Sequence, residues 1–119
     1  LSSICSNEAL CAFTASVYMA AVGPKGLKEV GSQCYSKAHY AWKAITAVPG
    51  FEAPLSGDFF HEFVTRCPVP VEKVMQKLAE KEILGGLPLP CGCILWCVTE
   101  KNSRTDIDRL VDILKEVAK

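Results

Sequence analysis

Apolar side chains recur at helical spacing over residues 7–22. Asn7 is placed to cap this helix, with Glu8 in its first turn, and Gly23-Pro24 ends it. The other faces of the helix carry small or hydroxylated side chains instead of charges, which is the pattern of a helix buried on several sides. In a chain this short, we expect that helix to pack against something outside it. The apolar positions at helical spacing are Leu10, Phe13, Val17 and Ala20.

A second helix is predicted from Pro24 to Val48, where Pro49-Gly50 stops it. Gly31 lies inside this helix and costs about 1 kcal/mol relative to alanine, so we expect a close approach by a neighbour there. A narrow apolar seam runs along the helix at steps of three and four residues. Its members are Leu27, Val30, Cys34, Ala38, Ala41, Ile45 and Val48.

The middle of the chain changes to the alternating pattern of strands. Residues 51–55 are predicted as a short strand, and 59–67 as the best strand, because it is rich in aromatic and β-branched side chains. In residues 59–67, His61 and Glu62 should then point to opposite faces. A helix over 71–82 follows, with Val71, Val74, Met75 and Leu78 turned inward.

The last third combines a loop, a strand and a helix. Residues 83–92 are predicted as a loop, since Pro88 and Pro90 should prevent regular pairing. The continuous apolar run over 93–99 indicates a central strand. Ser103 and Asp106 have the spacing of a capping box before an amphipathic helix. The predicted fold class is therefore α+β, a small, mostly antiparallel sheet with helices packed on one face.

Composition narrows the function classes. The chain has 119 residues, of which 50% are hydrophobic, so it is too apolar to be intrinsically disordered. Its 13 basic and 13 acidic residues cancel, which disfavours nucleic acid as a partner. The charge-free stretch over residues 9–24 is shorter than the ~20 residues that cross a bilayer, so no membrane is expected.

The seven cysteines have two interpretations. We expect free, buried thiols in a reducing cytosol, because the spacing matches no disulfide framework. The alternative is a metal or redox cluster at Cys91, Cys93 and Cys97. No histidine lies near them in sequence, and C-x-C is not the C-x-x-C redox motif.

Candidate chemistry is sparse, since no nucleotide-binding, zinc-protease or nucleophile-elbow motif is present. His39 is expected to be a surface side chain. Cys67 has no base near it in sequence. Glu100 follows the last predicted strand, a place where functional polar groups are often found.

Several segments together resemble the C-terminal part of glycine dehydrogenase (decarboxylating) subunit 1, one of the two chains of the split P-protein of the glycine cleavage system. The resemblance spans nearly the whole chain. It is carried by the order and spacing of residues 6–12 (SNEALCA), 23–27 (GPKGL), 37–40 (KAHY), 59–64 (FFHEFV), 83–86 (ILGG) and 97–100 (CVTE).

The resemblance implies a type I pyridoxal-phosphate enzyme, of which residues 1–119 would be the C-terminal small domain. Residues 1–48 would be two linking helices and 49–119 the α+β core. The cofactor lysine would belong to subunit 2, so neither a catalytic residue nor a bound cofactor is expected here. Weak candidates near the domain interface are Asn7, His61 and Glu100.

The same resemblance implies partners and a reaction. The whole enzyme, a cytoplasmic heterotetramer, would decarboxylate glycine and pass the aminomethyl group to the lipoyl arm of the H-protein. This chain would be a piece of a longer subunit, inactive alone, whose first helix packs on a missing large domain or on subunit 2. The alternatives are a non-enzymatic α+β module that binds a protein through that helix and, less favoured, a cysteine-based metal or sulfur carrier.

Overall fold

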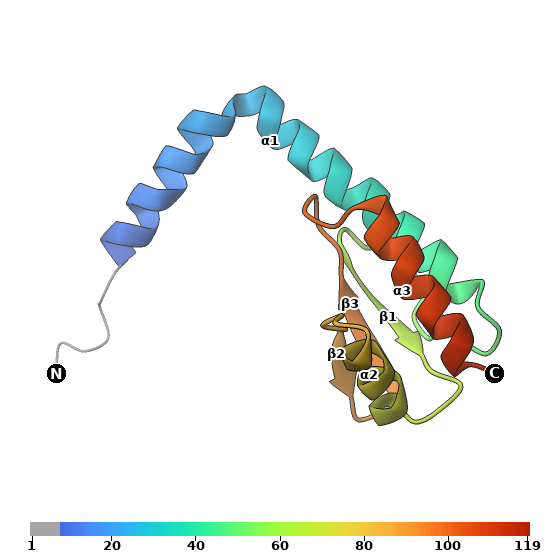
Figure 1. Cartoon of the computed structure of the whole chain (residues 1–119). Coiled ribbons are helices and arrows are strands. Elements are labelled where there is room, and N and C mark those ends of the chain that lie inside the picture. Colours follow the sequence, from blue (N-terminus) through green and yellow to red (C-terminus); the bar gives the residue numbers. More distant parts are fainter. Residues whose placement is uncertain (1–7) are drawn as a thin grey trace, which may run out of the picture. The chain divides into compact units, whose positions relative to one another are not determined.

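The computed structural model describes residues 8–119, so the predicted helix cap Asn7 lies outside the described residues. The chain divides between Ser32 and Gln33 into two compact units. Figure 1 shows the elements in sequence colours. They are the helices α1 (Glu8–Thr46), α2 (Val71–Glu80) and α3 (Arg104–Val117) and the strands β1 (Glu62–Arg66), β2 (Leu87–Leu89) and β3 (Cys93–Cys97).

The described part of the first unit is the N-terminal part of α1. Gly23 has φ 67° and ψ 175°, which interrupts the helix just before Pro24 and confirms the break predicted there. Leu10, Phe13 and Val17 are 61%, 66% and 52% exposed, so their predicted burial does not occur within this chain. The expected close approach at Gly31 does not occur within this chain, because a Cβ built there meets no atom within 4 Å.

The second unit begins with the rest of α1, which carries the predicted seam into the core. Cys34, Ala38, Ala41 and Ile45 are buried, as is Val48 just beyond the helix. Small alanines at two of these positions let the helix approach its neighbours closely. The seam prediction is therefore confirmed in this unit, whereas Leu27 in the first unit remains 39% exposed.

The sheet has the strand order β1-β3-β2, with both pairs antiparallel. On one face, β1 and β3 present large buried side chains that form one cluster with the apolar faces of all three helices. On the other face, Glu62 and Cys97 lie opposite each other and are exposed. This arrangement confirms an α+β fold with helices on one face of a small antiparallel sheet. The buried face carries Phe63, Thr65, Ile94 and Trp96.

Three predicted segments need correction. The expected strand over 51–55 is reduced to a single bridge between Glu52 and Arg66, because Pro54 has no N–H to continue a ladder. β1 starts at Glu62, three residues later than expected. β2 lies inside the predicted loop. Pro88 is tolerated there because β2 is an edge strand that pairs with β3 on one side only.

The capping box before α3 is confirmed. The Asp106 N–H donates to Ser103 Oγ at 3.1 Å, and the Ser103 N–H donates to Asp106 Oδ2 at 3.1 Å. Two N–H groups at the start of the helix are thus satisfied by local side chains. Among the described residues, no helix has the length and apolar character needed to cross a membrane.

Candidate functional site

The first candidate group lies where β1 begins and β3 ends. The antiparallel register places Glu62 directly opposite Cys97. The Val98 N–H donates to the His61 carbonyl at 2.9 Å, which fixes the backbone of His61 beside the same strand ends. Backbone pairing therefore positions all three chemically active side chains, His61, Glu62 and Cys97.

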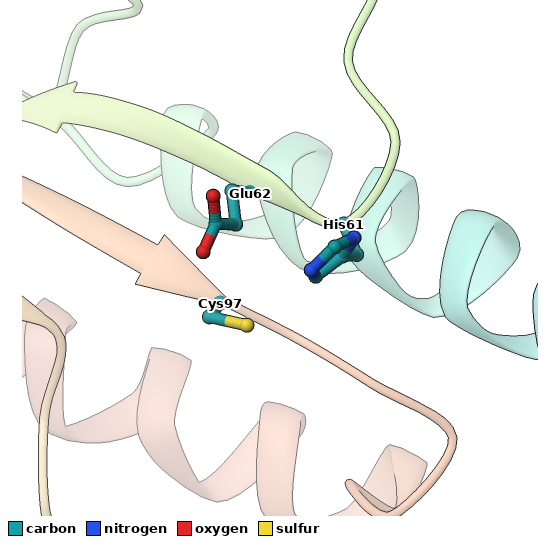
Figure 2. Close-up of side chains that lie close together, drawn as sticks. All are labelled: His61, Glu62 and Cys97. Atoms are coloured by element: carbon teal, nitrogen blue, oxygen red, sulfur yellow. The ribbon is translucent and has the colours of Figure 1, made fainter. Parts of the chain in front are cut away.

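These three side chains lie close together (Figure 2). One donor atom from each, a ring nitrogen, a carboxylate oxygen and Sγ, lies within 4.8 Å of the others. The prediction that His61 and Glu62 face opposite ways is wrong, because His61 precedes β1 in a bend and the alternation of a strand does not extend to it. His61 is half-buried, and its Nδ1 is buried without a hydrogen-bond partner.

Partial desolvation, together with the neighbouring Glu62 carboxylate and the Cys34 thiol, raises the pKa of Cys97. A thiol whose pKa is raised is mostly protonated at neutral pH and is a poor nucleophile. Although His61 lies beside it, this arrangement does not give an activated cysteine. The raised pKa argues against a cysteine hydrolase, while the nitrogen, oxygen and sulfur donors side by side are those of a ligand site.

The second candidate, Glu100, is held in a turn after β3. The Cys34 thiol donates to its Oε2 at 3.4 Å, and Lys37 Nζ donates to its backbone oxygen at 2.7 Å. The adjoining Thr99 N–H donates to Asn102 Oδ1 at 2.8 Å, which closes the turn. Cys34 and Lys37 were not predicted as partners of Glu100, since they lie 66 and 63 residues away and no local pattern indicates such contacts.

The structure does not join the candidates into one site. No described contact links His61 to Glu100, and Asn7 lies outside the described residues. His39 is half-buried between two rings: its ring stacks on Tyr35 at 3.9 Å and on Phe59 at 4.1 Å between centroids. His39 is therefore a partly exposed side chain, as expected, and its ring packs between two aromatic neighbours.

A groove of about 610 Å³ borders the His61 group on the side of α3. It follows the part of β3 that β2 does not cover, and Glu62 and Cys97 line one end of it. Its charged lining is mainly acidic, with one guanidinium. Those charged residues are Glu62, Glu82, Asp106 and Arg109.

The cysteines are less buried than expected. Of those described, Cys34 and Cys93 are buried, while Cys11, Cys91 and Cys97 are exposed, and all are free thiols. Burial and the neighbouring Cys93 raise the pKa of Cys67 to about 11. Cys97 lies at the far end of β3 from Cys93, so it does not form one site with Cys91 and Cys93.

A family model and sequence relatives both place this chain in one protein family. The family "Glycine cleavage system P-protein" matches residues 1–114. The chain is 44% identical over 122 residues to a probable glycine dehydrogenase (decarboxylating) subunit 1 of Moorella thermoacetica, covering 98% of this chain and 28% of that protein. It is 40% identical over 116 residues to the protein of that name from Chlorobium limicola, covering 95% of this chain and 26% of that protein.

Solved structures agree with the sequence relatives. The inhibitor-bound crystal structure of glycine decarboxylase (P-protein) of the glycine cleavage system matches with a TM-score of 0.88 at 34% identity, covering 98% of this chain and 28% of that one. A C-DES mutant with glycine covalently linked to its PLP cofactor matches with a TM-score of 0.66 at 16% identity, covering 75% of this chain and 24% of that one. At this identity the match shows a shared fold alone. The chain thus spans 28% of the length of the Moorella thermoacetica relative and 26% of that of the Chlorobium limicola relative.

Proposed function

Because this chain belongs to the glycine cleavage system P-protein family, we propose that it acts as the C-terminal small domain of a glycine dehydrogenase (decarboxylating) subunit. The whole enzyme would decarboxylate glycine and transfer the aminomethyl group to the lipoyl arm of the H-protein. The observation that carries the proposal is the match over residues 1–114, together with the 0.88 TM-score to a glycine decarboxylase.

The exposed helix of the first unit supports this role. Leu10, Phe13 and Val17 fall on one stripe of α1, and each is more than half exposed. Contiguous apolar surface of this kind marks an interface. We propose that the rest of the P-protein assembly covers it, because the relatives are more than three times as long as this chain. Residues 1–48 would then link the α+β core to that assembly.

The cofactor of the proposed enzyme is pyridoxal phosphate, which acts as an electron sink when the bond to the carboxylate breaks. Such enzymes hold it through a lysine side chain. Among the described residues that line the groove beside β3, none is a lysine, so this groove by itself does not fit the cofactor. On the resemblance alone, the lysine is assigned to the partner subunit.

His61 and Glu100 are proposed as positioning residues at the interface of the small domain. His61 directly precedes β1, and Glu100 lies in the turn after β3. Glu100 also receives hydrogen bonds from two side chains of α1. Asn7 stays a candidate on the resemblance. The proposal also includes a cytoplasmic heterotetramer that breaks down glycine.

Assembly of the enzyme tests the docking part of this proposal. The full-length subunit would be co-expressed with tagged subunit 2, and the amount that co-purifies would be measured. Phe13→Ser with Val17→Ser should reduce recovery of the complex or of folded subunit. The matched pair Lys25→Ser with Lys28→Ser alters exposed charged positions of the same helix and should leave recovery unchanged.

The alternative of a free-standing interaction module rests on the same exposed stripe. It predicts that the apolar double variant leaves the recovered complex unchanged. Equal recovery for both double variants would therefore count against the docking proposal.

A further inference from the structure

We propose that His61, Glu62 and Cys97 form a binding site for a borderline-soft divalent cation, with Zn²⁺ as the best match. The proposal does not depend on the enzymatic role of the chain. It starts from a juxtaposition that backbone pairing enforces: Glu62 and Cys97 are register partners, and His61 is tied to β3 through the Val98 N–H.

The donor set determines the class of metal. Thiolate sulfur disfavours Mg²⁺ and Ca²⁺, which prefer oxygen ligands alone, whereas imidazole and carboxylate disfavour Cu⁺, which prefers soft sulfur ligands. One sulfur, one nitrogen and one oxygen donor suit Zn²⁺ and its spectroscopic substitute Co²⁺. Three protein ligands would leave a fourth position for water or a ligand from the groove that Glu62 and Cys97 line.

The geometry is close to what such a metal requires. Zinc bonds of about 2.0–2.3 Å at tetrahedral angles place the donor atoms roughly 3.4–3.6 Å apart. Here the donor atoms lie within 4.8 Å of one another, so a shift of about an ångström brings them to that spacing. The side chains of Glu62 and Cys97 are exposed and their strand backbones are paired, so this shift needs a change of side-chain rotamers alone.

The buried Nδ1 of His61 is a second, independent observation. An imidazole nitrogen that is buried without a hydrogen-bond partner carries a desolvation cost. A metal ion bound at Nδ1 would relieve that cost by giving this nitrogen a partner. The rings of Phe60 and His61 lie nearly perpendicular to each other, at 5.1 Å between centroids, so the imidazole also has an aromatic neighbour here.

Titration with Co²⁺ tests the site. The 119-residue chain, purified under reducing conditions without metal, should bind one Co²⁺ and develop the near-ultraviolet charge-transfer band of a thiolate–Co²⁺ bond. Cys97→Ser should abolish that band. Cys91→Ser removes another exposed thiol outside the group and should keep it. His61→Gln should weaken the apparent affinity by more than about tenfold, since even outer-shell partners are worth that much.

Zn²⁺ gives a second readout that does not depend on the sulfur band. It should raise the Tm of the parent chain and of Cys91→Ser but not that of Cys97→Ser, because a ligand that binds the folded state stabilises it. Far-ultraviolet circular dichroism checks that each variant is folded. The proposal is overturned if no charge-transfer band forms with excess Co²⁺, if the band survives Cys97→Ser, or if Cys91→Ser removes it.

Discussion

The indole N–H of Trp96 donates a hydrogen bond of 2.9 Å to the hydroxyl of Thr65, across two paired strands and inside the core. Thr65 is fully buried and Trp96 nearly so. The two residues are diagonal neighbours on the helix-covered face of the sheet, since Thr65 pairs with Ile94 and Trp96 with Phe63. A buried polar pair is thus satisfied by a cross-strand contact.

Thr65→Val should destabilise the chain by about 1–3 kcal/mol, because it leaves the buried indole N–H unpaired. Trp96→Phe removes the indole N–H donor, and it also destabilises the chain because the smaller ring packs less well in the core. The double variant should cost less than the sum of the two single variants, by about 0.5–1.5 kcal/mol. Urea denaturation of the four proteins measures this coupling, and strictly additive changes would show that the hydrogen bond contributes nothing.

Gly86 is predicted to be intolerant of a side chain. A Cβ at this position would fall against the backbone oxygen of Leu95 and 2.7 Å from Ile94 Cγ2. Gly86→Ala should therefore push β2 away from β3 and cost about 1–3 kcal/mol in unfolding experiments. Gly31→Ala, at a helical site with open surroundings, is the control and should stabilise by about 0.5–1 kcal/mol. Equal effects of the two substitutions would contradict the described packing.

The capping box predicts a pH dependence. Hydrogen bonds from Ser103 lower the pKa of Asp106 below its ordinary value of 3.8. A carboxyl group whose pKa is lower in the folded state stabilises that state above its ordinary pKa, and the contribution is lost as pH falls through the folded value. Asp106→Asn should thus lower Tm at pH 7 more than at pH 3. A difference in Tm that is the same at both pH values would refute this linkage.

Alkylation rates test the described thiols. The pKa of Cys67 is raised to about 11, so only about one part in a thousand is thiolate at pH 8. Mass spectrometry should find Cys91, which is exposed, modified by iodoacetamide well before Cys67. The Cys67 rate should increase about tenfold per pH unit from 8 to 10. Modification of Cys67 as fast as Cys91 would disagree with its described environment.

Elements whose signal is local were predicted well. The start of α3 could be found because Ser103 and Asp106 interact within one turn. β3 could be recognised as the central strand because its apolar run contains no interruption. The apolar seam predicted over Cys34 to Val48, which begins in α1 and ends just beyond it, is buried as expected. Helical periodicity alone determines which of these side chains share a face.

Elements that depend on distant partners were not predicted. Pro88 excludes a central strand but not an edge strand, and only the assembled sheet decides which one β2 is. The group of His61, Glu62 and Cys97 depends on the register of β1 with β3 and on a bend that strand alternation does not foresee. The thiol of Cys34 on Glu100 likewise arises only when the chain has folded.

We propose that these residues form part of a glycine decarboxylase. Release of labelled CO₂ from carboxyl-labelled glycine, by the full-length subunit assembled with subunit 2 and supplied with pyridoxal phosphate and lipoyl H-protein, tests it most directly. We expect glycine-dependent release, which Phe13→Ser with Val17→Ser should reduce and Lys25→Ser with Lys28→Ser should leave unchanged. Absence of glycine-dependent release from the assembled parent enzyme would contradict it.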